Sequence, residues 1–286
     1  MRCTIHLTPA DAAWPTEFEG LQPAPRELWL RGRRELLARR PRVAVVGTRS
    51  PTPYGQSQAE RFARAFARAG VLVVSGLARG IDEIAHRAAL EGGGETLAVL
   101  GCGVDRPWPS GALSDRLATE GLLISEYEPG TPPARHHFPL RNRLIAALSG
   151  AVVVIEAAFR SGSLITAHWG SEQGRAVFAL PGRVDQPMAR GCHRLIAEGA
   201  ALLEEPAQVL EALGIEAGRA PEAASRMPLD ARRERLLAGL LGETLRAEEL
   251  AERTGTGLSE CLALLSELEL DGRVVRAPGG LYRLPA

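Results

Sequence analysis

Short apolar runs alternate along the first three quarters of the chain with segments whose apolar positions recur at helical spacing. The apolar runs lie at residues 43–46, 71–74, 97–100, 122–125, 151–155 and 177–180. They predict strands that are buried on both faces, as in a parallel sheet. After the first run, Phe62, Ala65, Phe66 and Ala69 predict a helix over residues 56–69. Repeated strand–helix units predict an α/β fold with a doubly wound, mostly parallel sheet.

Both ends of the chain depart from this pattern. The N-terminal part is rich in proline, and a stretch rich in Gly, Ala and Pro follows the last strand–helix unit. Leucines then recur over three short segments that predict helices, and apolar pairs on either side of Gly279-Gly280 predict a hairpin. The predicted organisation is an N-terminal extension at residues 1–41 that packs on the main domain, a main domain at 42–213, a linker at 214–228 and a winged-helix domain at 229–286.

Small hydroxylated residues follow the strand predicted at residues 151–155. They are Ser161, Gly162, Ser163 and Thr166, and the next predicted helix spans residues 164–174. A strand, a small polar loop and a helix together aim backbone N–H groups and the positive end of the helix dipole at an anion. Gly162 allows close approach to the backbone. The alternative is that these residues only cap the helix.

Arginines also gather where strands end. Gly47, Thr48 and Arg49 follow the first strand, and Arg79 and Gly80 follow the second. Because the carboxyl ends of parallel strands meet at one edge of a sheet, we expect Arg49 to reach the same phosphate as the serine loop. The same holds for Arg79, unless it forms an ion pair with Asp82 or Glu83.

A third cluster opens the helix after the strand at residues 122–125. It contains Arg135, Phe138, Arg141, Asn142 and Arg143. Guanidinium groups hold phosphates, and an aromatic ring offers a stacking face that accepts any base. Single-strand binding needs both, so the cluster predicts such a site. The alternative is that Phe138 packs in the core.

Charge is balanced over the whole chain. Its 34 basic residues are all arginine and are matched by 34 Asp and Glu. Residues 42–215 hold 17 of each sign, so no diffuse basic field of the kind common in DNA-binding proteins is present. Binding to a polyanion would therefore depend on local clusters at the strand ends and on self-association.

Several protein classes lack support in the sequence. No apolar stretch is long enough to span a membrane, and no secretory signal is evident. The four cysteines are scattered, which argues against zinc and is typical of a cytoplasmic protein. His136 and His137 have no matching ligands nearby. Neither a P-loop nor a complete dinucleotide fingerprint is present. We therefore expect no metal and no cofactor.

The motifs in order resemble those of the DprA/Smf family. The resemblance covers roughly residues 25–213 and rests on Gly-Thr-Arg, Ser-Gly-Leu-Ala-Arg-Gly-Ile-Asp, Ser-Glu-Tyr, Phe-Pro-Leu-Arg-Asn-Arg, Ser-Gly-Ser-Leu-Ile-Thr-Ala and Pro-Gly. It implies a Rossmann-like domain that binds single-stranded DNA, self-associates and loads the RecA recombinase during natural transformation. Since a P-loop and a complete dinucleotide fingerprint are absent, we expect no enzymatic activity. The residues expected to contact DNA are Gly47, Thr48, Arg49, Arg79, Gly80, Arg135, Phe138, Arg141, Asn142, Arg143, Ser161, Gly162, Ser163 and Thr166.

Two other functions remain open at this point. One is a nucleotide-acting hydrolase similar to the nucleoside-monophosphate phosphoribohydrolases, although Trp169 replaces their catalytic Glu. The other is a duplex-binding regulator that uses the winged helix. Residues 229–286 hold 8 Arg against 10 Asp or Glu, and the third helix carries Glu260, Glu267 and Glu269 without a basic residue. That charge favours a protein-docking or structural role.

The end of the main domain predicts a self-association surface. The apolar residues Leu195, Ile196, Leu202 and Leu203 lie close together in sequence, with His193 beside them. An exposed sheet edge with an apolar flank is normally covered. The family resemblance implies that a second subunit covers it, so we expect a homodimer through residues 191–213. The alternative for Ile196 is a place in the core.

Overall fold

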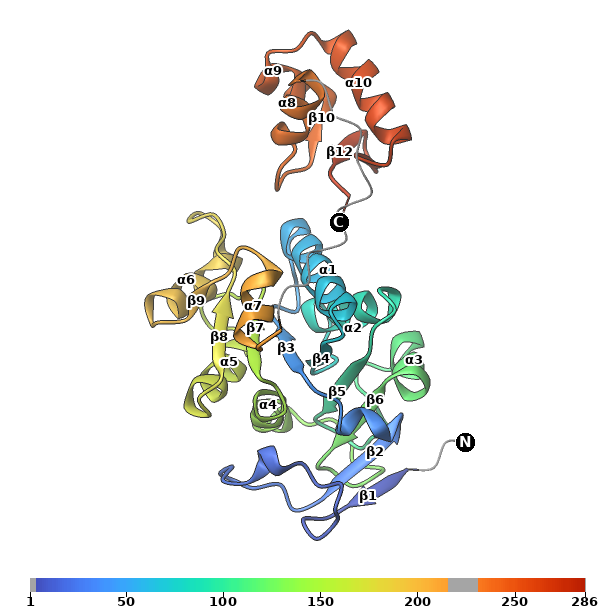
Figure 1. The fold of residues 1–286 in the computed structure, drawn as a ribbon, viewed down its shortest axis with the longest axis vertical. Helices are drawn as coiled ribbons and strands as arrows, with labels where there is room; N and C mark the ends of the chain where they lie inside the picture. The colour runs from blue at the N-terminus through green and yellow to red at the C-terminus, as the bar shows by residue number, and fades with distance from the viewer. Residues whose placement is uncertain (1–3, 216–230, 286) are drawn as a thin grey trace. The chain divides into compact units, whose positions relative to one another are not determined.

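The structure is a computed structural model that describes residues 4–215 and 231–285, and it divides into two compact units, residues 1–218 and 219–286 (Figure 1). Each unit is considered by itself. The predicted linker, residues 214–228, lies outside the described residues except for its first two positions. No described helix has both the length and the apolar character needed to cross a membrane.

The first unit is built on a nine-stranded sheet with the order β1-β2-β6-β5-β4-β3-β7-β8-β9. Seven strands are parallel: β3 (Arg42–Val46), β4 (Leu72–Ser75), β5 (Thr96–Leu100), β6 (Leu122–Ser125), β7 (Ala151–Val154), β8 (Ala176–Ala179) and β9 (Ala201–Leu202). The predicted mostly parallel, doubly wound sheet is confirmed. The order reverses at β3, which pairs with β4 on one side and β7 on the other. Ligand sites of such sheets lie at this reversal.

Helices cover both faces of the sheet, as Figure 1 shows. Alternate residues of each strand point to opposite faces, so Val43 and Val45 pack with α1, α2 and α7, whereas Ala44 and Val46 pack with α4 and α5. The helices are α1 (Pro53–Arg68), α2 (Ile81–Glu91), α3 (Ala112–Glu120), α4 (His137–Ala147), α5 (Ser163–Glu172), α6 (Arg190–Ala197) and α7 (Pro206–Ala212), with short 3-10 helices at Thr16–Phe18, Arg34–Leu37 and Pro187–Ala189.

The N-terminal segment does more than pack on the main domain. Its strands β1 (Ile5–Leu7) and β2 (Leu28–Gly32) extend the sheet, and β2 pairs antiparallel with β6. Leu28 and Leu30 are buried in the core below β6. This segment therefore covers the edge that β6 would otherwise expose.

The second unit has the predicted winged-helix fold. Its helices are α8 (Ala231–Gly239), α9 (Ala247–Thr254) and α10 (Leu258–Leu270), and its sheet has the order β10 (Leu245–Arg246), β12 (Leu281–Arg283), β11 (Val275–Ala277). Leu236, Leu250, Leu265 and Tyr282 are buried in a core of its own. The leucine spacing therefore predicted the three helices because each turns one apolar face to this core.

Candidate functional site

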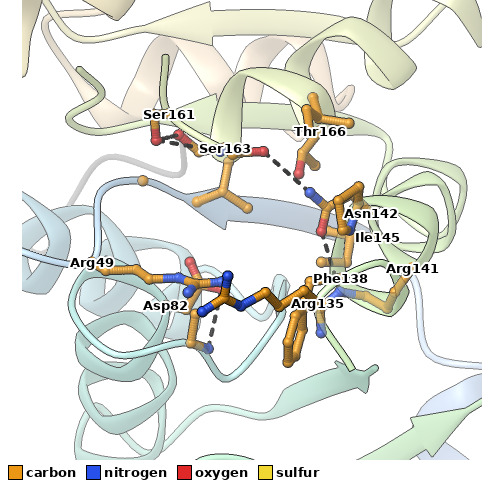
Figure 2. Close-up of a pocket in the computed structure, with 16 residues that line it drawn as sticks. Arg49, Asp82, Arg135, Phe138, Arg141, Asn142, Ile145, Ser161, Ser163 and Thr166 are labelled. Atoms are coloured by element: carbon orange, nitrogen blue, oxygen red, sulfur yellow. Dashed lines mark hydrogen bonds between the residues drawn. The ribbon is translucent and has the colours of Figure 1, made fainter. Parts of the chain in front are cut away.

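A hollow of about 600 Å³ lies where the strand order reverses, at the carboxyl ends of β3 and β7 (Figure 2). Its walls come from four segments that are far apart in the sequence: the loop after β3, the loop after β4 with the start of α2, the start of α4, and the start of α5. The residues that line it are Val46, Gly47, Arg49, Ala78, Asp82, Arg135, Phe138, Pro139, Arg141, Asn142, Ile145, Ser161, Gly162, Ser163, Ile165 and Thr166. The three clusters predicted from the sequence thus meet in one pocket.

One wall presents an aromatic ring and two exposed guanidinium groups. The guanidinium carbon of Arg49 lies 5.6 Å from the centroid of the half-buried Phe138 ring. Arg49 and Arg135 both point into the pocket in Figure 2, and neither has an ion pair within the described part of the chain. A Cβ on Gly101 would lie 3.0 Å from the Phe138 ring, so glycine at this position leaves room for the ring. This wall can bind phosphate and stack a base.

The opposite wall is the hydroxyl-rich start of α5. The Ser161 and Ser163 hydroxyls are 2.8 Å apart, and Thr166 lies one turn along the helix. A Cβ on Gly162 would meet nothing within 4 Å, so this backbone is open to a ligand. The Asn142 amide donates to the Gly162 carbonyl (3.2 Å) and ties this wall to α4. The helix N-terminus and the hydroxyls together favour an anion here.

Arg141 was predicted to contact DNA. It lines the pocket, but its side chain is buried and does not project into the pocket. Its side chain is 3% exposed and donates to the carbonyls of Gly76 (2.9 Å) and Val99. Burial lowers the pKa of Arg141 to about 10, and burial also raises the pKa of the nearby Asp82 carboxyl. The guanidinium carbon lies 6.0 Å from the Phe138 ring. Arg141 therefore supports the ring from within the protein, because its donors are occupied by carbonyls.

Arg143 does not line the pocket, so its predicted DNA contact is wrong. Its side chain is 1% exposed, pairs with both Glu126 carboxylate oxygens (2.8 and 2.7 Å) and donates to the Pro23 carbonyl (2.8 Å). Two residues along a helix correspond to a rotation of about 200°, so Arg143 faces away from Arg141. It joins α4 to the N-terminal segment.

The glycines near β3 and β4 are required by close packing. A Cβ on Gly47 would lie 2.6 Å from the Ile81 side chain. Gly80 has φ +85°, and its Cβ would lie 2.5 Å from the Thr48 carbonyl oxygen. Thr48 itself is buried and donates to the Met188 sulfur (3.6 Å). Gly80 and Thr48 do not line the pocket and instead hold the loops that bear Arg49 and Arg79.

Arg79 is exposed and lies outside the pocket lining. Neither predicted ion pair, with Asp82 or Glu83, is formed among the residues described. Instead, Asp82 accepts hydrogen bonds from the backbone N–H groups of Gly76 (3.1 Å) and Ala78 (3.4 Å). Arg79 is therefore available to a ligand beyond the pocket rim.

Two residues that position α4, Tyr127 and His137, were not among the predicted site residues. The Tyr127 ring stacks on His137 at 3.9 Å, and His137 Nδ1 lies 3.0 Å from the Gly101 carbonyl oxygen. These contacts fix the first turn of α4 and hence Phe138. The Ser-Glu-Tyr motif was the available signal. No group of three or more possible metal ligands occurs within residues 4–215 or 231–285.

The residues predicted to form the self-association surface differ in their exposure to solvent. Leu202 is 44% exposed on β9, which is the edge strand, and Leu195 and Ile196 are partly buried against the core. His193 Nε2 lies 2.9 Å from the Gly182 carbonyl oxygen. Leu203 is 0% exposed and packs in the core, so its prediction as an interface residue is wrong.

Comparisons with known proteins agree with this architecture. A family model described as DNA recombination-mediator protein A matches residues 5–214, and one described as DprA winged helix domain matches residues 220–280. Protein Smf of Escherichia coli (strain K12) is 39% identical over 98% of this chain and 77% of its own length. A putative DNA processing protein DprA of Mycobacterium tuberculosis is 40% identical over 96% of this chain and 78% of its own length.

Two solved structures are similar to this chain over nearly three quarters of its length. DNA processing protein A from Streptococcus pneumoniae superposes with a TM-score of 0.69 and 42% identity, covering 72% of this chain and 73% of that one. The Helicobacter pylori protein superposes with a TM-score of 0.67 and 31% identity, covering 74% and 98%; that structure is described as giving insight into a single-stranded DNA binding mode. With matches over both units, the chain belongs to the DprA/Smf family of DNA-processing, recombination-mediator proteins.

Proposed function

We propose that the protein binds single-stranded DNA in the pocket at the ends of β3 and β7. The observation that carries this proposal is the pairing of Arg49 with Phe138 on one wall, opposite the hydroxyls of Ser161 and Ser163. Phosphates are held by the exposed arginines and the start of α5, while a base stacks on Phe138. The description of the Helicobacter pylori relative supports the same ligand.

Single strands suit this pocket better than duplex DNA. A stacking ring can reach a base face only when that base is not already stacked in a duplex. Phe138 is half-buried and lies close to Gly101, so its ring is part of the pocket wall and does not project from the surface toward a duplex groove. The hydroxyls opposite it can donate to the phosphate of any nucleotide, which makes binding independent of sequence.

We extend the proposal to recombination. The family is one of recombination mediators, and we propose that this protein loads the RecA recombinase onto single strands during natural transformation. We also propose that it acts as a homodimer through α6 and the β9 edge. The Gln208 side chain donates to the Leu202 carbonyl (3.1 Å) on that edge. Since this carbonyl is occupied, a second subunit would pack on side chains such as Leu202 rather than add a strand.

The proposal includes no catalysis. Asp82 is the carboxylate that lines the pocket, and two backbone N–H groups bind it. Glu156, at the end of β7, accepts from the Thr52 N–H (2.9 Å) and hydroxyl (2.7 Å) and does not line the pocket. Both carboxylates serve to hold the fold, which disfavours a nucleotide hydrolase.

We propose a protein-docking or structural role for the winged helix. Glu260 and Glu267 on α10 pair with Arg232 (2.7 Å) and Arg233 of α8. Those arginines are therefore engaged by α10 instead of being aimed at a duplex. The remaining carboxylate of α10, the exposed Glu269, would repel phosphates.

Replacing Arg49 tests the DNA site. Arg49→Ala should weaken single-strand binding about tenfold for all sequences, because a charged contact to phosphate is worth about 1.5–3 kcal/mol and water replaces part of it. The slope of log affinity against log salt should fall by about 0.7. Arg68→Ala is the matched control. Arg68 is also exposed, but it lies at the last residue of α1, away from the carboxyl ends of the strands where the pocket lies. A folded Arg49→Ala protein with unchanged affinity and slope would contradict the proposal.

A further inference from the structure

A tight turn beside the pocket exposes an aromatic ring that the proposed site does not use. The Ser161 N–H donates to the Ala158 carbonyl (3.0 Å), so Phe159 and Arg160 occupy the tip of this turn. Phe159 is 55% exposed. Arg160 is exposed as well, and no ion pair to it is formed among the residues described.

The turn is held firmly from below. The Gly191 N–H donates to the Ala157 carbonyl (2.8 Å). A Cβ on Gly191 would lie 2.7 Å from the carbonyl oxygens of Ala157 and Ala158, so only glycine allows α6 to approach the turn this closely. The tip is thus fixed by backbone contacts, and its exposed ring is not the result of a loose loop.

Cations flank the exposed ring. The Arg194 guanidinium carbon lies 5.4 Å from the Phe159 ring centroid, and its Nε donates to Glu198 (2.7 Å). Arg160 adjoins the ring in sequence. An apolar protein partner would have to desolvate Arg160 without compensation, whereas a polyanion would neutralise it. The charge beside the ring therefore favours nucleic acid over a protein surface.

The turn is continuous with the pocket wall. Ser161 ends the turn and begins the row of hydroxyls that lines the pocket, at the end of that row away from Thr166 in Figure 2. Phe159 is two residues away, at most about 7 Å along the backbone. A DNA strand that leaves the pocket past Ser161 would therefore reach the Phe159 ring next.

We propose that the turn at residues 158–161 is a second stacking site, where a base beyond the pocket stacks on Phe159 and Arg160 neutralises a phosphate. This inference rests on the proposed single-strand binding in the pocket. The proposed subsite follows β7, outside the pocket. The protein would then contact more nucleotides of the DNA strand than the pocket alone can hold.

The test measures the affinity of Phe159→Ala and of the unsubstituted protein for oligothymidylates of about 4 to about 16 nucleotides. Short strands should bind equally well to both. Long strands should bind Phe159→Ala between about fivefold and about 150-fold more weakly, which is the loss of one stacked base at about 1–3 kcal/mol. The salt slope should not change, since stacking involves no counterion release. Arg160→Ala should instead lower the slope by about 0.7 on long strands only.

Two further variants identify the contact. Phe159→Trp should restore long-strand affinity and add fluorescence quenching over the unsubstituted protein, whereas Phe159→Leu should not restore affinity. Equal affinity of Phe159→Ala and the unsubstituted protein for every length would overturn the inference. So would dissociation of a dimer by Phe159→Ala in sedimentation, because the ring would then be a subunit contact. If Arg49→Ala has no effect on any length, the pocket proposal itself fails, so the two failures can be distinguished.

Discussion

Three arginines of the predicted site differ in what already occupies their donors. Arg49 is exposed and faces the Phe138 ring, so its donors are available to a phosphate. Arg141 gives its donors to carbonyls at the ends of β4 and β5, and Arg143 gives its donors to Glu126. A buried guanidinium whose donors bind protein groups offers few hydrogen bonds to a phosphate, so Arg141 and Arg143 mainly shape the site.

His86 shows how the same burial affects titration. Its side chain is fully buried, and its Nδ1 lies 2.6 Å from the Thr96 hydroxyl, which donates to the Val73 carbonyl. The His86 Nδ1 therefore donates to Thr96. Burial, with a smaller contribution from the Arg141 charge, lowers the pKa of His86 to about 3.

This shift predicts a pH-dependent stability. Unfolded His86 titrates near 6.5, so between about pH 6.5 and about pH 3 the unfolded chain binds one more proton than the folded one. The contribution of His86 is complete above that range and is lost as pH falls. The unfolding free energy of the protein relative to His86→Gln should shrink by about 1 kcal/mol per pH unit below 6.5. Urea unfolding of both proteins from pH 7 to pH 5 measures this difference, and a constant difference would contradict the assignment.

The sequence predicted which residues gather at the pocket better than it predicted their orientation. Gly47, Phe138 and Ser161 follow or precede recognisable elements, and parallel strands place those positions at one edge. The burial of Arg141 and Arg143 depends on the rotation of α4 and on partners such as Glu126, which is distant in sequence. Local pattern holds no information about such partners.

At the scale of elements, the strands of the nine-stranded sheet that lie within the repeated strand–helix units were predictable and those outside them were not. β2 has five residues but lies in the proline-rich N-terminal segment, and it was not predicted. The strands β3 to β8 are apolar runs buried on both faces, a pattern that survives in sequence. β1 has three residues and β9 has two, too few for any periodicity. The exposed Leu202 is the last residue of β9, and the buried Leu203 follows it directly. Alternation across the sheet separates them, so treating both as surface residues was wrong for Leu203.

The β9 edge carries the prediction on self-association. Leu202→Glu should shift the protein from dimer to monomer in sedimentation, because a charge would be desolvated in the proposed interface. It should also weaken DNA binding, since two linked sites raise each other's effective concentration. Leu202 is a better probe than Ile196, which packs partly on the core and whose change to Glu would affect folding. A folded Leu202→Glu protein that remains dimeric would place the interface elsewhere.

At the scale of the whole molecule, the formal net charge of zero limits how the protein can attract DNA. The chain has 34 residues of each charge, so attraction to DNA comes from where arginines lie and not from net charge. Many exposed arginines outside the pocket are paired, as Arg116 is with Glu120 (2.9 Å) and Arg253 with Glu243 (2.9 Å). Arg49 and Arg135 line the pocket and form no ion pair with any residue that the structure describes, so their charges are available there to a phosphate.

We also predict that binding requires neither a metal ion nor a nucleotide. The pocket carboxylate Asp82 accepts backbone hydrogen bonds, and the phosphate-binding groups are arginines, hydroxyls and a helix N-terminus. Dialysis against a chelator should leave single-strand affinity within about twofold of its original value, a difference of about 0.4 kcal/mol. Loss of binding that magnesium or ATP restores would contradict this prediction.

The most direct test of the central claim is a salt titration of single-stranded and duplex DNA of equal length and sequence with the unsubstituted 286-residue chain. We predict tighter binding of the single strand at every salt concentration, with log affinity falling linearly with log salt by about 0.7 for each phosphate contacted. Equal or tighter binding of the duplex would contradict the account, because the Phe138 stacking site is closed to paired bases.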